Sequence, residues 1–175
     1  MNLAECLRVI EKHQSQAPVK VVAIARDLGL NVYRTDEWSD KISGMIVRDP
    51  KSERSAGYSI YVNGHHHEHR RRFTIAHEIA HYVLHRDFIG DGIQDDALYR
   101  SGLSTRQEVQ ANQMAADILM PWHLINAAMD SGTADVESLA KLFNVSLSAM
   151  SIRLGVPYET EDNGEATGAK ERALA

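Results

Sequence analysis

Apolar and polar positions follow two different spacings along the chain, and each spacing predicts one type of secondary structure. Strict alternation, which is typical of a half-buried strand, occurs at 41–50 and 58–64, and 31–35 is a further short strand. The polar stretches at 51–57 and 86–103 are predicted loops. Apolar residues recur every three or four positions, the spacing of one helix face, in the segments 1–14, 18–30, 68–85, 105–120, 121–132 and 135–157.

The order of these elements predicts an α+β fold, in which helices flank a small antiparallel sheet. Segment 135–157 has a turn around Asn144 between two short helices and resembles a helix-turn-helix. We therefore divide the chain into a core of residues 1–130, a helical segment of residues 131–157 packed on that core, and a tail of residues 158–175. The tail has few apolar residues and is predicted to be disordered.

The composition is that of a globular protein. The chain has 175 residues, enough for one hydrophobic core, and 43% of them are apolar. No apolar run approaches the eighteen or so residues that a membrane span requires. Charges at Glu5, Arg8 and Glu11 stand among the apolar positions of the first helix, so this segment is not a signal peptide. A single cysteine excludes an internal disulfide, and we expect a cytoplasmic protein.

The charge distribution argues against a general affinity for nucleic acid. The formal net charge is −5, and the tail holds five acids and two bases. The folded body is therefore close to neutral, whereas a protein that binds nucleic acid needs a basic surface. We expect no direct binding of nucleic acid and no association with membranes.

The sequence "HEIAH" at residues 77–81 is the strongest candidate for chemistry. Residues four apart lie on the same helix face, so His77 and His81 can offer their imidazoles to one ion. Glu78 lies about 100° further round the helix, beside that ion. This is the arrangement of two zinc ligands and a general base in His-Glu-x-x-His peptidases. The competing interpretation is a pair of half-buried polar residues, but the neighbouring small residues Ala76 and Ala80 favour a site by letting another backbone approach.

His85 continues the same spacing but cannot complete the site. From His77 to His85 the helix rises about 12 Å, too far for one ion with Zn–N bonds of about 2.1 Å. We interpret His85 as a side chain that supports a ligand by hydrogen bonding, or as a cation at the helix C-terminus.

The third ligand has to come from another segment, and Glu108 is the best candidate. Asn112 follows four residues later on the same face, where its carbonyl can accept the free N–H of a ligand histidine. Glu108 has a second interpretation, because "TRQE" also fits a capping box with Thr105 as the N-cap. The residues alone leave both interpretations open.

Two further basic runs precede the motif. The cluster "HHHEH" at 65–69 follows a turn, and consecutive histidines point in different directions, so they do not prearrange one metal site. We interpret this cluster as an exposed loop or first helical turn, and the run "RRR" at 70–72 as a solvated face.

These motifs together resemble a known family. "RRRFTIAHEIAHYVLH" at 70–85, followed by "EVQANQMAADILMP" at 108–121, is similar to the ImmA/IrrE metallopeptidases. Weaker similarity extends over about residues 18 to 156. The resemblance implies that His77, His81 and Glu108 bind one catalytic zinc ion and that Glu78 is the catalytic glutamate. Family members often carry an acid where this chain has Gln110.

The resemblance also implies a function. Family members are cytoplasmic endopeptidases of bacteria, phages or mobile elements, and characterised ones cut repressors with helix-turn-helix domains. We therefore expect a zinc endopeptidase that cleaves a repressor or antitoxin encoded nearby and so derepresses genes. The donor that stabilises the oxyanion stays open among Tyr82, Tyr99, His85 and His123. The alternatives are a DNA-binding regulator and a zinc protein that binds its partner without cutting it.

Overall fold

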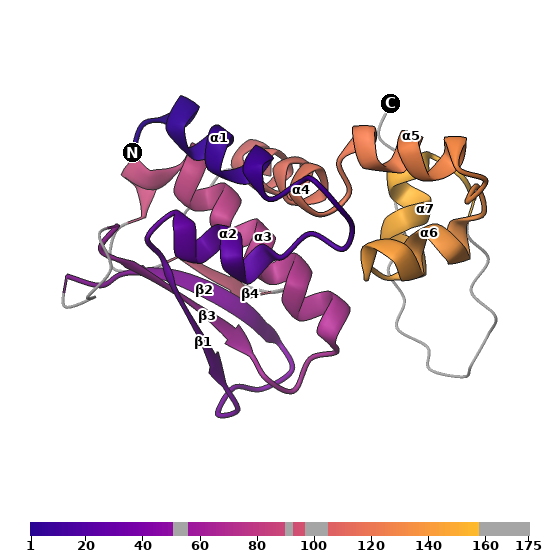
Figure 1. The fold of residues 1–175 in the computed structure, drawn as a ribbon. Helices are drawn as coiled ribbons and strands as arrows, with labels where there is room; N and C mark the ends of the chain where they lie inside the picture. The colour runs from indigo at the N-terminus through magenta and orange to yellow at the C-terminus, as the bar shows by residue number, and fades with distance from the viewer. Residues whose placement is uncertain (51–55, 90–92, 97–104, 158–175) are drawn as a thin grey trace.

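The computed structural model describes residues 1–50, 56–89, 93–96 and 105–157, and Figure 1 shows its helices and strands. The strands are β1 (Asn31–Thr35), β2 (Ile42–Arg48), β3 (Tyr58–Asn63) and β4 (Ile93–Asp96). The helices are α1 (Leu3–Lys12), α2 (Val21–Asp27), α3 (Glu68–Leu84), α4 (Thr105–Leu119), α5 (Trp122–Asp130), α6 (Val136–Phe143) and α7 (Leu147–Leu154), with a short 3-10 turn at Arg86–Phe88.

The predicted α+β class is confirmed, but the sheet is mixed and not purely antiparallel. Its order is β1-β3-β2-β4, and β2 is antiparallel to both of its neighbours. β1 runs parallel to β3, with Val32 opposite Ile60. The prediction was wrong here because β3 lies between β1 and β2, which are consecutive in the chain. Alternation along a strand reports which face is buried and carries no information on the direction of its neighbour.

The edge strand β4 lies in a stretch that we predicted as a loop, 86–103. β4 pairs with β2, with Ile93 opposite Ile46 and an irregularity between Ile42 and Gly44. Its sequence "IQDD" has no apolar alternation, so only backbone pairing makes it a strand. The predicted disorder of 158–175 lies outside the described residues.

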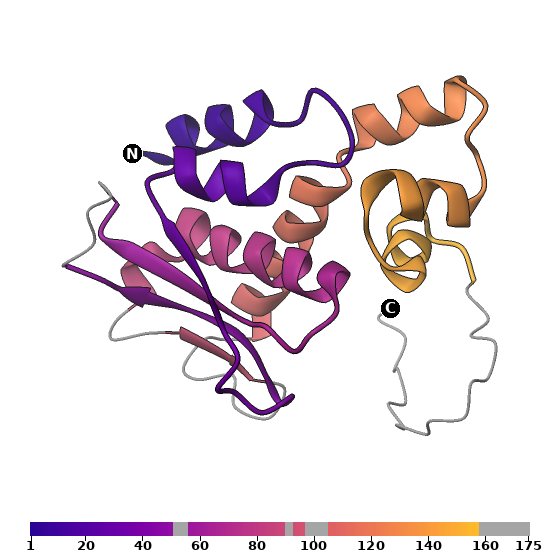
Figure 2. The ribbon, with the colours of Figure 1, turned by 60° about the horizontal axis from the view of Figure 1, so that its bottom comes forward.

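Helix α3 packs on the sheet on one side and against α4 on another, as Figure 2 shows. Ala76 and Ala80 on α3, and Ala111 and Ala115 on α4, are all fully buried. Small side chains let helix axes approach closely. This close approach brings the first turn of α4, with Glu108, to the histidines of α3.

The helical segment α6–α7 is fixed to α3 through Arg72. Its guanidinium donates hydrogen bonds to the carbonyl oxygens of Val19, Asn144 and Phe143 at 2.9, 3.0 and 3.4 Å. Asn144 has a φ of 53° and ends α6, and its side-chain amide donates to Glu68. Arg72 is thus half-buried instead of lying on the solvated face that we predicted for the arginine run. The proposed boundary near residue 130 stays a prediction.

Replacing Arg72 by methionine is expected to lower the free energy of unfolding by about 1–3 kcal/mol, because buried carbonyl groups lose their charged donor. Urea denaturation followed by circular dichroism measures this change. Arg26→Met is the control, since Arg26 pairs with Asp27 at the surface with 59% of its side chain exposed. Equal stability of Arg72→Met and wild type would contradict the anchoring role.

Among the described residues, no helix combines the length and apolar character needed to traverse a bilayer.

Candidate metal site

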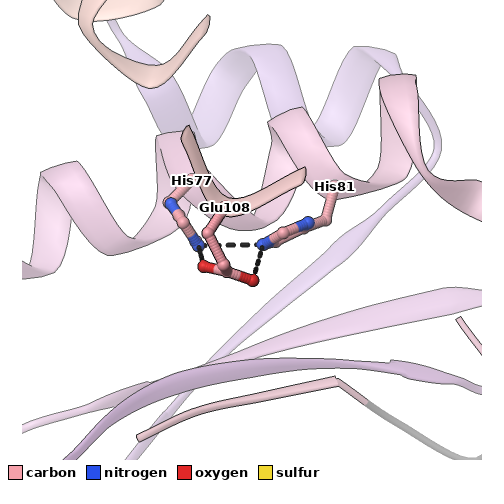
Figure 3. A group of neighbouring side chains, drawn as sticks. All are labelled: His77, His81 and Glu108. Atoms are coloured by element: carbon pink, nitrogen blue, oxygen red, sulfur yellow. Dashed lines mark hydrogen bonds and ion pairs between the residues drawn. The ribbon is translucent and has the colours of Figure 1, made fainter. Parts of the chain in front are cut away.

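His77, His81 and Glu108 converge on one point between α3 and α4, as Figure 3 shows. The Nε2 atoms of the two histidines are 2.8 Å apart. The Glu108 carboxylate oxygens lie 3.5 Å from Nε2 of His77 and 3.6 Å from Nε2 of His81. All three side chains are buried. In the described part of the chain, these are the residues whose histidine, cysteine or carboxylate donor atoms cluster closely enough to hold a metal ion.

The donor set fits a divalent ion such as zinc. A tetrahedral ion with bonds of about 2.0–2.1 Å separates its ligand atoms by about 3.4 Å. The two histidine–carboxylate distances are close to this value. The two histidine Nε2 atoms, which are 2.8 Å apart, would have to move only slightly further from each other. Two imidazoles and one carboxylate leave a fourth position, which is the pattern of a catalytic zinc site.

The protonation state of His81 suits a metal ligand. Burial, reinforced by the neighbouring His77 and partly opposed by Glu108, lowers the pKa of His81 from 6.5 to about 3. The imidazole is therefore neutral at physiological pH, as coordination requires.

Glu78 is fully buried on the side of α3 that faces β2. A Cβ atom added to Gly44 of β2 would clash with Thr74 Cγ2 and would lie 3.6 Å from Glu78 Oε1. Gly44 thus permits the close approach of strand and helix that places the Glu78 carboxylate between them. Our sequence reasoning did not single out Gly44, although an isolated glycine within an alternating strand is the signal for such an approach.

His85 lies directly behind His81. The Nδ1 atoms of His81 and His85 are 3.2 Å apart, and Nε2 of His85 is 3.2 Å from Oε1 of Gln110. His85 therefore makes contact with a proposed ligand, while its own ring is held by α4. Sequence reasoning missed Gln110, which was noted only as a departure from the family.

The structure does not place Asn112 where we expected it. Its side chain is exposed, and among the described contacts it makes no hydrogen bond to His77 or His81. Asn112 instead borders a groove next to the site. Glu108 lies inside α4, which begins at Thr105, so Thr105 is a helical residue and not the residue before the helix.

The other candidates are occupied elsewhere or lie outside the described residues. The Nε2 atoms of His65 and His66 bond to the carbonyls of Asp36 and Asp40, and His67 caps α3. Nε2 of His123 bonds to the carbonyl of Gln14. Tyr82 is 2% exposed and packs edge-on against Tyr58, with Arg86 over its ring. Tyr99 is outside the described residues.

Comparison with known proteins identifies the fold and the family of this chain. A Mycobacterium tuberculosis transcriptional regulator has a similar fold, with a TM-score of 0.59 and 19% sequence identity over 93% of this chain and 49% of that chain. The chain thus spans about half the length of that structure. No curated protein matches the sequence. The model of the IrrE N-terminal-like domain, peptidase family M78, matches residues 25–155, from α2 to the end of α7. The chain therefore belongs to this metallopeptidase family, as the ImmA/IrrE resemblance of its sequence predicted.

Proposed function

We propose that this protein is a zinc-dependent endopeptidase that cleaves a helix-turn-helix repressor or an antitoxin. The observation that carries the proposal is the buried group of His77, His81 and Glu108 with Glu78 one residue from a ligand. Family membership supports peptide-bond hydrolysis as the reaction. The substrate class rests on the resemblance to ImmA/IrrE proteins, and a cytoplasmic location on the same resemblance.

The proposed reaction requires residues that bind the ion and a residue that transfers the proton. His77, His81 and Glu108 hold the ion, which when bound lowers the pKa of water and polarises a carbonyl group. Glu78 takes a proton from the attacking water at its carboxylate and delivers it to the nitrogen of the leaving amine. The buried surroundings of Glu78 exclude competing solvent and strengthen its interaction with charge that develops during the reaction.

A direct role in DNA binding has less support. Arg153 is the basic residue of α7, the second helix of the helix-turn-helix-like segment. Its guanidinium pairs with Asp117 at 2.7 Å, donates to the carbonyl of Met120 and lies over the ring of Trp122. The contacts of Arg153 are thus made within the protein, whereas a helix that reads DNA needs arginine or lysine side chains that are available to bind phosphates.

The experiment combines metal analysis with a cleavage assay. The purified protein is exposed to zinc, its metal content is measured, and it is incubated with helix-turn-helix repressors or antitoxins whose genes lie near its own. We expect one zinc ion per chain and discrete fragments in the mass spectrum, both abolished by a chelator. A protein that holds no metal would contradict the site. Bound zinc without cleavage would favour a non-cleaving regulator, and salt-sensitive, sequence-specific DNA binding would favour the DNA-binding alternative.

Gln110 is expected to support zinc binding through His85. If the amide oxygen of Gln110 accepts the Nε2 proton of His85, Nδ1 of His85 is free to accept the Nδ1 proton of His81. Nε2 of His81 then keeps its lone pair for the ion. Gln110→Leu should weaken zinc binding about 10–100-fold, as measured by competition with a fluorescent chelator.

Two variants of α4 complete this test. Gln110→Glu can accept the same hydrogen bond and should restore the affinity. Gln113→Leu, also exposed on α4, should leave it unchanged. Equal weakening by Gln110→Leu and Gln113→Leu would show a general effect on the helix and contradict the role of Gln110.

A further inference from the structure

An open groove of about 900 Å³ lies between the N-terminal half of α3, the C-terminal half of α4 and α7. Most of its surface is apolar, contributed by Phe73, Ala116, Met120, Val145, Ala149 and Ile152. Ile152 is 75% exposed, although it is a large aliphatic residue. A single exposed isoleucine is ordinary, but one that lines an apolar groove marks a surface for an apolar partner.

The groove lies next to the metal site, one helical turn from two of the proposed ligands. Phe73 precedes His77 by one turn of α3, and their rings are 6.4 Å apart. Asn112 follows Glu108 by one turn of α4 and borders the groove. From Arg70 to His77 the helix rises about 10 Å, which is the length of about three extended residues. A polypeptide that lies in the groove therefore reaches the metal ligands within three residues.

The arginine and histidine side chains of the groove have no acidic neighbour among its described lining residues. These side chains belong to Arg70, Arg153, His67 and His69. Arg153 is neutralised by Asp117. The exposed Arg70 donates to the hydroxyl of Ser43 at 2.8 Å and, within the described part of the chain, forms no ion pair. Its positive charge favours a partner with a carboxylate at this end of the groove.

We propose that the groove binds the segment of the protein substrate next to the scissile bond. This segment has about three extended residues, with an apolar side chain against Ile152 and Met120 and a carboxylate at Arg70. The inference rests on the proposed peptidase function. It also gives the helix-turn-helix-like segment a role, because α7 forms one wall of the substrate groove.

Cleavage-site profiling tests this proposal. The zinc-loaded protein digests a library of proteome-derived peptides, and mass spectrometry maps the cuts. We expect enrichment of apolar and acidic residues within three positions on one side of the cut. Ile152→Glu should raise KM at least about tenfold for a synthetic peptide with the preferred sequence, with kcat little changed, because an apolar contact is replaced by a charge. Arg70→Glu should shift the preference from acidic to basic peptides.

Matched variants and the possible outcomes separate the two proposals. Val22→Glu and Arg8→Glu change exposed residues of the same types on α2 and α1, and both should cut as wild type does. If wild type cuts but Ile152→Glu and Arg70→Glu keep its KM and its profile, the groove proposal alone is overturned. If zinc-loaded wild type cuts no peptide, the proposed function fails and this inference with it. A dimer in sedimentation that Ile152→Glu dissociates would assign the groove to self-association and overturn the proposal.

Discussion

Glu78→Gln is expected to leave zinc binding intact and to reduce cleavage by about 10²–10⁴-fold. The amide matches the carboxylate in size, so the buried space beside Thr74 and Gly44 stays filled. What is lost is the group that we propose as the acceptor of a proton from water. Because the proposed donor atoms belong to His77, His81 and Glu108, the metal content should equal that of wild type.

The measurement pairs metal analysis with single-turnover cleavage of the same substrate. Glu137→Gln is the control, because Glu137 lies on the surface of α6 with 64% of its side chain exposed and pairs with Lys141. Wild-type cleavage rates in Glu78→Gln would mean that Glu78 is not the base. Loss of zinc together with activity would mean that Glu78 helps to hold the ion.

The helices that carry the site were predictable from sequence. Segments 68–85 and 105–120 were expected to be helical, and the structure has α3 at Glu68–Leu84 and α4 at Thr105–Leu119. The spacing of His77 and His81 follows from the helix repeat alone, so their shared face was also predictable. Both results depend only on interactions within one helix.

Features that depend on two elements were not predictable in this way. A helical wheel places Gln110 about 160° from Glu108 and Asn112 on the same face as Glu108. The sequence therefore predicted that Asn112, and not Gln110, makes the supporting hydrogen bond near the ligands. The structure instead brings Gln110 to His85, since the way α4 packs against α3 decides which side chains meet. Strand β4 was missed for the same reason, because its pairing with β2 cannot be recognised from the sequence of β4 alone.

Glu108→Ala is expected to weaken zinc binding by more than the 10–100-fold that is typical for loss of a residue that only supports a ligand. Removing the carboxylate takes away one of three ligands and leaves two histidines, fewer than catalytic zinc sites use. Cleavage should fall with the metal content at limiting zinc. Glu108→His is expected to recover zinc, because three histidines also form a zinc site.

The competing role for Glu108 is a favourable charge in the first turn of α4, worth about 0.3–1 kcal/mol of stability. The two roles predict different results. A purely helix-stabilising Glu108 would make Glu108→Ala less stable without zinc but equally able to bind it. Glu137→Ala removes an acid from the first turn of α6, a helix that carries none of the proposed ligands, and should affect stability alone. If Glu108→Ala and Glu137→Ala bind zinc equally well, the third ligand is another residue.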